Sequence, residues 1–263
     1  MISRKIKILY KEAVKVLYYA KTYWALRECL LINGVINIKP FLFRRWRAGC
    51  AYYTGFLNGE KVFLKVDTKL FMLKNEKAFY DCVGDKLGEK LLELHFFHES
   101  PEFQVACFSF SEEGKELSPI DLINHPEYLK EILNILLVLK RNKIIHRDIK
   151  LDNFILDKGR VKIIDFYFSN SLTSTAKFFV ELDVNNDEYL SVLKRLGDRF
   201  KPSYFVWNDF ISFKNILEEI IRECNLPEEK LVIFYNVIEE SESYAKGAYY
   251  IPNFFDYLRK VEL

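Results

Sequence analysis

The chain has 263 residues, half of them apolar, with a formal net charge of +2 and five cysteines. So many apolar residues can bury a sizeable core, which excludes an intrinsically disordered chain. The cysteines are scattered, odd in number and never spaced as C-x-x-C, which argues against a disulfide framework and a zinc site. We therefore expect a globular protein of the reducing cytoplasm.

Residues 1–40 predict a basic helical extension. Residues 1–50 contain eleven Lys and Arg but only two Glu, so positive charge is concentrated at this end. At helical spacing one face carries Arg4, Lys7, Lys11 and Lys15, and the other carries Ile6, Leu9, Tyr10, Ala13, Val14 and Leu17. The helix either packs its apolar face on the fold or contacts an anionic membrane surface or a phosphorylated glycan. No apolar run reaches the roughly 18 residues that a membrane-spanning helix needs.

Residues 41–110 have a β-rich pattern that contains one helix. The expected strands cover residues 41–49, 51–57, 61–66, 91–97 and 103–110, and the helix covers residues 70–83. After a boundary near residues 108–113, apolar residues recur at helical spacing. A helix is expected over residues 126–142, and a further one within residues 183–203. The sequence thus predicts an α+β fold with a small β-rich part (41–110) and a mainly helical part (111–263).

Residues 144–168, "IIHRDIKLDNFILDKGRVKIIDFYF", predict a β-hairpin with an unusual number of charged residues at its ends. Gly159 supplies the turn between two short strands. A hairpin holds its two ends side by side, so Asp148 and Asn153 before the first strand should lie near Asp165 after the second. Two carboxylates and an amide oxygen are hard oxygen ligands of the kind that suits Mg²⁺.

The motif "HRDIKLDN" (146–153) resembles the protein-kinase catalytic loop H-R-D-L-x-x-x-N, and "IIDFY" (163–167) resembles the strand and D-F-G that follow it. The resemblance implies a two-lobed kinase fold and Mg-ATP phosphoryl transfer. It assigns Asp148 to the acceptor hydroxyl, Lys150 to the transferred phosphate, and Asn153 and Asp165 to Mg²⁺. By the same resemblance, His146 and Phe166 are packing residues, and Arg147 meets a phosphate if the following loop is phosphorylated.

The resemblance also nominates residues outside the hairpin. "VFLKV" resembles V-A-I-K, so Lys65 would pair with the nucleotide phosphates and Glu76, on the following helix, would be its carboxylate partner. The alternative for Glu76 is a solvated helix face. Gly49 would belong to the loop that covers the nucleotide phosphates. Asp209 would either brace the catalytic loop or only cap its own helix.

The sequence departs from the family pattern at several points. A G-x-G-x-x-G loop is missing, and only Gly49 and Gly55 lie in its place; either could simply serve a turn. Asp165-Phe166-Tyr167 stands where the family has D-F-G. No A-P-E follows, so the segment that forms the peptide-binding platform in the family is not assigned here. The helical lobe is expected to be reduced. Hydroxyl residues that phosphorylation could reach are Ser169, Ser171, Thr173, Ser174 and Thr175, although ordinary loop composition also explains them.

Three hypotheses follow for function. The first is a protein serine/threonine kinase, which Lys150, two residues after the aspartate, favours. The second is a kinase of a sugar hydroxyl, similar to lipopolysaccharide core kinases, which the basic first 50 residues favour. The third is a pseudokinase scaffold, favoured by the poor glycine loop and Tyr167 but not by the retained Lys65, Asp148, Asn153 and Asp165. No nucleic-acid motif is visible. We expect a cytoplasmic protein, to which the anionic-surface alternative for residues 1–50 would add peripheral contact with the inner membrane face.

Overall fold

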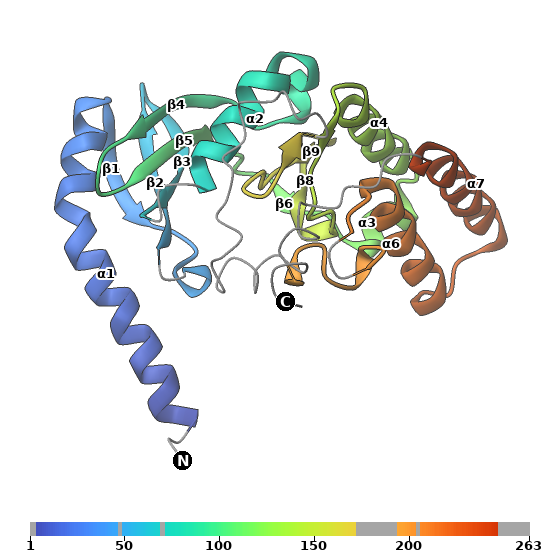
Figure 1. The fold of residues 1–263 in the computed structure, drawn as a ribbon, viewed down its shortest axis with the longest axis horizontal. Helices are drawn as coiled ribbons and strands as arrows, with labels where there is room; N and C mark the ends of the chain where they lie inside the picture. Colours follow the sequence, from blue (N-terminus) through green and yellow to red (C-terminus); the bar gives the residue numbers. More distant parts are fainter. Residues whose placement is uncertain (1–3, 47–48, 69–71, 172–193, 204–205, 247–263) are drawn as a thin grey trace, which may run out of the picture. The chain divides into compact units, whose positions relative to one another are not determined.

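The computed structural model describes residues 4–46, 49–68, 72–171, 194–203 and 206–246 (Figure 1). Its contacts divide the chain into two compact units. The first comprises Met1–Lys77 and Glu93–Phe110, and the second comprises Ala78–Leu92 and Ser111–Leu263. The first unit is rich in β-structure and the second is mainly helical, so the predicted α+β class is confirmed.

The first unit is built on a five-stranded antiparallel sheet with the order β1-β2-β3-β5-β4. Its elements are α1 (Arg4–Ile32), β1 (Val35–Pro40), η1 (Phe43–Arg45), β2 (Cys50–Leu57), β3 (Glu60–Asp67), the first part of α2 (Met72–Leu87), β4 (Leu94–Glu99) and β5 (Gln104–Ser109). Asn58 and Gly59 join β2 to β3 with positive φ angles, which is the backbone of a tight hairpin turn. The end of α1 packs on this sheet through Leu26, Cys29 and Leu30.

The strand expected at residues 41–49 is wrong, because the first strand comes earlier. β1 begins directly after the turn at Gly34 and pairs with β2. The chain then leaves the sheet at Leu42, whose left-handed backbone (φ 48°) breaks an extended run. The buried side chain of Trp46 donates from Nε1 to the carbonyl of Phe41 at 2.8 Å, which fixes η1 against the fold.

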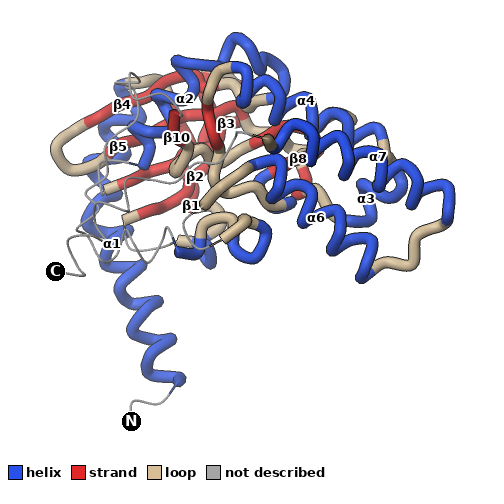
Figure 2. The backbone as a smooth tube through the Cα atoms, turned by 45° about the vertical axis from the view of Figure 1, so that its right-hand side comes forward, coloured by secondary structure: helices blue, strands red, loops and turns tan. Residues whose placement is uncertain are grey.

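In the described residues, the second unit packs the end of α2, four further α-helices and two small sheets around one core (Figure 2). Its elements are the remainder of α2, η2 (Gly88–Lys90), β6 (Lys115–Glu116), α3 (Pro119–Asn124), α4 (Glu127–Arg141), β7 (Ile144–Ile145), η3 (Leu151–Asn153), β8 (Phe154–Asp157), β9 (Arg160–Ile163), β10 (Asn170–Ser171), η4 (Asp198–Phe200), α6 (Asp209–Glu223) and α7 (Glu228–Ala245). The later residues of α2 belong here because Phe79, Val83 and Leu87 join this core. Of the helix expected within 183–203, residues 183–193 lie outside the described residues, as do Thr173, Ser174 and Thr175.

The hairpin predicted from the quoted motif is present. β8 and β9 pair antiparallel from Phe154 opposite Ile163 to Asp157 opposite Arg160, and Gly159 takes a positive φ of 73° in the turn. Among the described helices, none combines the length and apolar character needed to cross a bilayer.

Candidate active site

The loop between β7 and β8 carries the charged motif. β7 pairs with β10, and β8 pairs with both β6 and β9, so both ends of the loop are held in small sheets. Asp148, in the middle of the loop, is only 7% exposed. A buried carboxylate needs hydrogen-bond partners to stay ionised, and these partners define the site.

Both carboxylate oxygens of Asp148 are engaged. Oδ2 accepts from Lys150 Nζ at 2.7 Å and from Asn153 Nδ2 at 3.0 Å, and Oδ1 accepts from the backbone N–H of Gly197 at 2.7 Å. Burial raises the pKa of Asp148, but the charge and hydrogen bond of Lys150, together with the Gly197 amide, outweigh burial and hold the pKa below its ordinary value. The result is an ionised carboxylate in a fixed orientation.

The hairpin brings Asn153 next to the segment that contains Asp165. The backbone N–H of Ile164, one residue before Asp165, donates to the Asn153 carbonyl at 2.9 Å. The Asn153 amide nitrogen is used by the main chain and carboxylate of Asp148, so its amide oxygen is the atom suited to a cation. An amide oxygen at Asn153 and a carboxylate at Asp165, on segments joined by this backbone hydrogen bond, are ligand types that suit Mg²⁺.

His146 and Phe166 pack behind the loop. Both side chains are fully buried, and the Phe166 ring stacks on Phe79 with 3.5 Å between the ring centroids. His146 Nδ1 accepts from the Asp148 N–H at 3.3 Å, and Nε2 contacts the Ile164 carbonyl at 3.1 Å. This pattern requires a hydrogen on Nε2. Their packing links the Asp148 loop to the segment that carries Asp165.

Asp209 braces the loop from α6. Its carboxylate accepts from the backbone N–H groups of His146 at 2.7 Å and Arg147 at 3.1 Å. Burial raises the pKa of Asp209, opposed by His146 and by the two N–H donors. The cap of α6 is instead Asn208, whose side chain accepts from the N–H groups of Phe210 and Ile211. Of the two alternatives left open for Asp209, the bracing contact is therefore the one observed.

Arg147 is buried rather than displayed on the surface. Its Nε donates to the Phe168 carbonyl, and its guanidinium lies 5.5 Å from the ring centroid of Trp207. These contacts join the Asp148 loop to two neighbouring segments. The loop phosphate expected to meet Arg147 would lie largely within residues 172–193, outside the described part of the chain.

The lysine–glutamate pair predicted in the first unit is formed. Lys65 Nζ lies 2.8 Å from Glu76 Oε1 and 3.0 Å from Oε2, and both residues are buried. The solvated-face alternative for Glu76 is thus wrong, because the side chain turns inward to β3. An ammonium group held in this way is a fixed positive charge of the kind that can contact phosphate oxygens.

Gly49 and Gly55, the two glycines where the family has its phosphate-binding loop, occupy different structural positions. Gly49 lies directly before β2 with a φ of 90°, and its carbonyl accepts from the Thr68 N–H at 2.9 Å. Gly55 lies within β2, where a Cβ atom would approach Val35 to 2.7 Å. Gly55 therefore allows β1 to pack closely. Gly49 remains the predicted phosphate-cover residue on sequence grounds.

Gly197 and Lys201 were missed by the sequence reasoning. Gly197 has a φ of 68°, and a Cβ there would lie 3.1 Å from the Arg147 carbonyl, so the position favours glycine. Its backbone N–H donates to the carboxylate of Asp148, 49 residues away along the chain, and so completes the set of hydrogen-bond donors around that carboxylate. The available signal was a glycine followed by Asp and, soon after, Lys-Pro, which marks a turn but not its contact.

Comparison with known proteins supports what this geometry suggests. A family model of the protein kinase domain matches residues 102–191. The match supports membership of the protein-kinase-like superfamily. The chain is also 32% identical over 152 residues to Protein kinase 3 of Dictyostelium discoideum, and the aligned residues cover 55% of this chain and 16% of that protein.

Two further relatives are named serine/threonine-protein kinases. One is MPS1 of Saccharomyces cerevisiae, 28% identical over 120 residues, which cover 45% of this chain and 15% of that protein. The other is a probable KIN1 homolog of Encephalitozoon cuniculi, 30% identical over 132 residues, which cover 43% and 23%. The matched segments span between about a seventh and a quarter of these relatives, so the likeness covers only a part of each of them.

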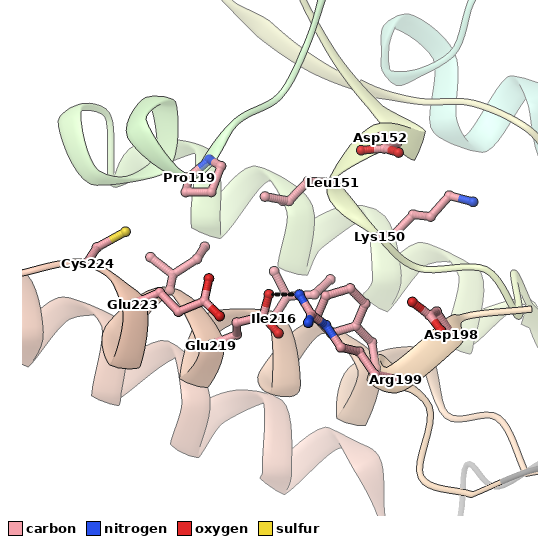
Figure 3. Close-up of a pocket in the computed structure, with 12 residues that line it drawn as sticks. Pro119, Lys150, Leu151, Asp152, Asp198, Arg199, Ile216, Glu219, Glu223 and Cys224 are labelled. Atoms are coloured by element: carbon pink, nitrogen blue, oxygen red, sulfur yellow. Dashed lines mark hydrogen bonds and ion pairs between the residues drawn. The ribbon is translucent and has the colours of Figure 1, made fainter.

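A cavity of about 310 Å³ adjoins the loop that carries Asp148 (Figure 3). It is lined by Pro119, Lys150, Leu151, Asp152, Asp198, Arg199, Phe200, Ile216, Glu219, Ile220, Glu223 and Cys224. The two cations among these residues are already paired, Lys150 with Asp148 and Arg199 with Glu219. The lining contains four carboxylates, those of Asp152, Asp198, Glu219 and Glu223, against these two cations, and Glu223 lies 3.9 Å from the guanidinium of Arg222. The excess of carboxylates gives the cavity an acidic character next to the predicted reaction centre.

Lys201 adds a positive charge near Asp148 that depends on pH. Burial lowers the pKa of Lys201 to about 8, opposed by Asp148 and Asp198, and its Nζ donates to the Lys194 carbonyl at 2.7 Å. The ammonium charge is therefore present below pH 8 and is lost as the pH rises through this value. Without that charge, an ionised Asp148 repels a phosphoryl group more strongly.

We expect the turnover of the wild-type kinase domain to fall with a midpoint near pH 8, as measured by its pH–rate profile. In Lys201→Arg the guanidinium stays charged, so the alkaline fall should move at least one pH unit higher. Thermal unfolding of both proteins checks that the variant is folded. An alkaline limb at the same pH in both proteins would assign it to another group.

Proposed function

We propose that this chain is an active kinase that transfers the γ-phosphoryl group of Mg-ATP to a serine or threonine hydroxyl of a protein. The observation that carries the proposal is the buried carboxylate of Asp148, which is held in one orientation by Lys150, Asn153 and Gly197. A scaffold that only binds partners has no chemical need for this arrangement. The named serine/threonine kinases among the relatives support the same reaction.

The residues divide the chemical work between them. Asp148 orients the acceptor hydroxyl and takes its proton as the acceptor oxygen bonds to the γ-phosphorus and the bond from this phosphorus to the β–γ bridging oxygen breaks. Lys150 lies at the same carboxylate and offsets negative charge on the transferred group. Asn153 and Asp165 would hold Mg²⁺, which neutralises phosphate charge when bound, and Lys65, fixed by Glu76, would contact the phosphates.

The acidic cavity favours a protein acceptor over a phosphorylated glycan. A basic side chain beside the acceptor hydroxyl would find the carboxylates of Asp152, Asp198 and Glu223, whereas a phosphate group would be repelled by them. The basic first 50 residues are the observation that favours the glycan acceptor. They belong to the other unit and do not line this cavity.

The acceptor can be identified with matched peptides. We expect a serine peptide with basic flanking residues to exceed its acidic counterpart in kcat/KM by about tenfold or more, because like charges in an interface oppose binding. Asp152→Asn combined with Glu223→Gln should reduce this preference. Glu218→Gln, on the same helix but facing Lys214, serves as the control. Preferential labelling of a phosphorylated glycan would instead support the sugar-kinase alternative.

A further inference from the structure

Helix α1 exposes an unusual amount of apolar surface. Of the thirteen large apolar residues that are exposed in the described part of the chain, six lie on this helix: Tyr10, Val16, Leu17, Trp24, Leu31 and Ile32. Tyr10, Leu17 and Trp24 are each about 70% exposed, at 70%, 69% and 68%. A large exposed apolar surface often marks a site of interaction.

Four of these residues form a row along the helix. Tyr10, Leu17, Trp24 and Leu31 are spaced by seven residues, which returns to nearly the same face after two turns. The row is about 32 Å long at 1.5 Å per residue. The first sheet is covered by a different side of α1, because Leu26, Cys29 and Leu30 are buried in its core.

The position of α1 leaves this row open to a partner. Figures 1 and 2 both show the end of α1 beside the sheet and its N-terminal half extending away from it. The expected packing of the apolar face on the fold therefore does not hold for Tyr10 and Leu17 among the described residues. In the described part of the chain these two side chains remain largely uncovered, so a partner surface would be needed to remove them from water.

The charge of α1 indicates what that surface is. Residues 4–32 contain seven Lys and Arg, distributed from Arg4 to Arg27, against two Glu. A second copy of α1 would bring like charges together in either orientation. An anionic lipid surface offers the opposite charge and an apolar layer at the same time, and Trp and Tyr are the aromatic residues favoured at its interface.

We propose that α1 binds the surface of an anionic bilayer, lying in the interface with Tyr10, Leu17 and Trp24 inserted between the lipid head groups. Basic side chains of the same helix contact the lipid phosphates. This inference goes beyond the proposed phosphoryl transfer and does not depend on it, because none of the residues involved is assigned to the active site.

Tryptophan fluorescence tests the proposal directly, since only one of the three tryptophans lies on this surface. Trp46 and Trp207 are 2% and 1% exposed, whereas Trp24 is 68% exposed. We expect vesicles of phosphatidylcholine with phosphatidylglycerol to shift the emission of the full chain to shorter wavelength, and pure phosphatidylcholine to do so weakly. Trp24→Phe should remove the shift, and high salt should reduce binding.

Vesicle flotation supplies a second measurement. Tyr10→Ser combined with Leu17→Ser should lower the vesicle partition coefficient by at least about tenfold, because two apolar side chains are lost from the lipid contact. Tyr235→Ser, at an exposed position on α7, should leave it unchanged. Equal binding to neutral and anionic vesicles would overturn the proposal. So would a Leu17-dependent dimer in sedimentation without vesicle binding, which would indicate helix pairing.

Discussion

Replacing Asp148 with asparagine is expected to lower turnover by about 10²- to 10⁴-fold while nucleotide binding changes little. The amide cannot take the proton of an acceptor hydroxyl, and it leaves Lys150 without its carboxylate partner. Asn153, Asp165 and Lys65 are untouched, so the groups expected to hold Mg-ATP remain. Steady-state kinetics give kcat, and titration with a fluorescent ATP analogue gives the nucleotide affinity.

Asp157→Asn is the matched control for this variant. Asp157 is a carboxylate of equal burial in the adjacent hairpin, paired with Lys162 at 2.9 Å and accepting from Ser111. Its loss should affect stability but not turnover per folded molecule. Unchanged turnover in Asp148→Asn would remove Asp148 from the proposed role, whereas a parallel loss of nucleotide binding would make it a structural residue.

Lys65→Ala is expected to reduce kcat/KM by about 100-fold and to destabilise the protein by about 3 kcal/mol. Glu76 would be left as an unpaired buried carboxylate, which is the costly way to break a buried ion pair. The phosphate contact expected of Lys65 would also be lost. Lys74→Ala breaks the exposed Lys74–Glu99 pair of the same unit, and such surface pairs contribute about 1 kcal/mol or less.

A double variant separates the two effects of Lys65. In Lys65→Met with Glu76→Leu, both charges are replaced by apolar groups, so much of the stability should return. Activity should not return, because no cation remains to contact the phosphates. Chemical denaturation and kinetics of the same preparations measure both quantities. Recovery of activity together with stability would show that Lys65 acts only through the fold.

The sequence was most informative where the functional residues are close together along the chain. Asp148, Asn153 and Asp165 flank one hairpin, and hairpin geometry alone brings their backbones together. Alternating apolar residues likewise located β2, β3 and β5 within one or two residues. Local rules suffice in these cases because the contacts are local.

Contacts between distant segments were not predictable in this way. Gly197 reaches Asp148 across 49 residues, and its only local signal was a turn. The strand expected at residues 41–49 failed because burial of Trp46 and the left-handed backbone of Leu42 override β propensity. For α1, helical periodicity located an apolar face but did not show what covers it. Tertiary packing decided each of these outcomes.

The most direct test of phosphoryl transfer incubates the purified chain with Mg²⁺, γ-labelled ATP and a serine peptide with basic flanks, and follows label in the peptide over time. We expect label to accumulate with the wild-type protein and to be nearly absent with Asp148→Asn at equal folded concentration. Equal labelling by both proteins, or none by the wild type with peptide or glycan acceptors, would contradict catalysis by the Asp148 carboxylate.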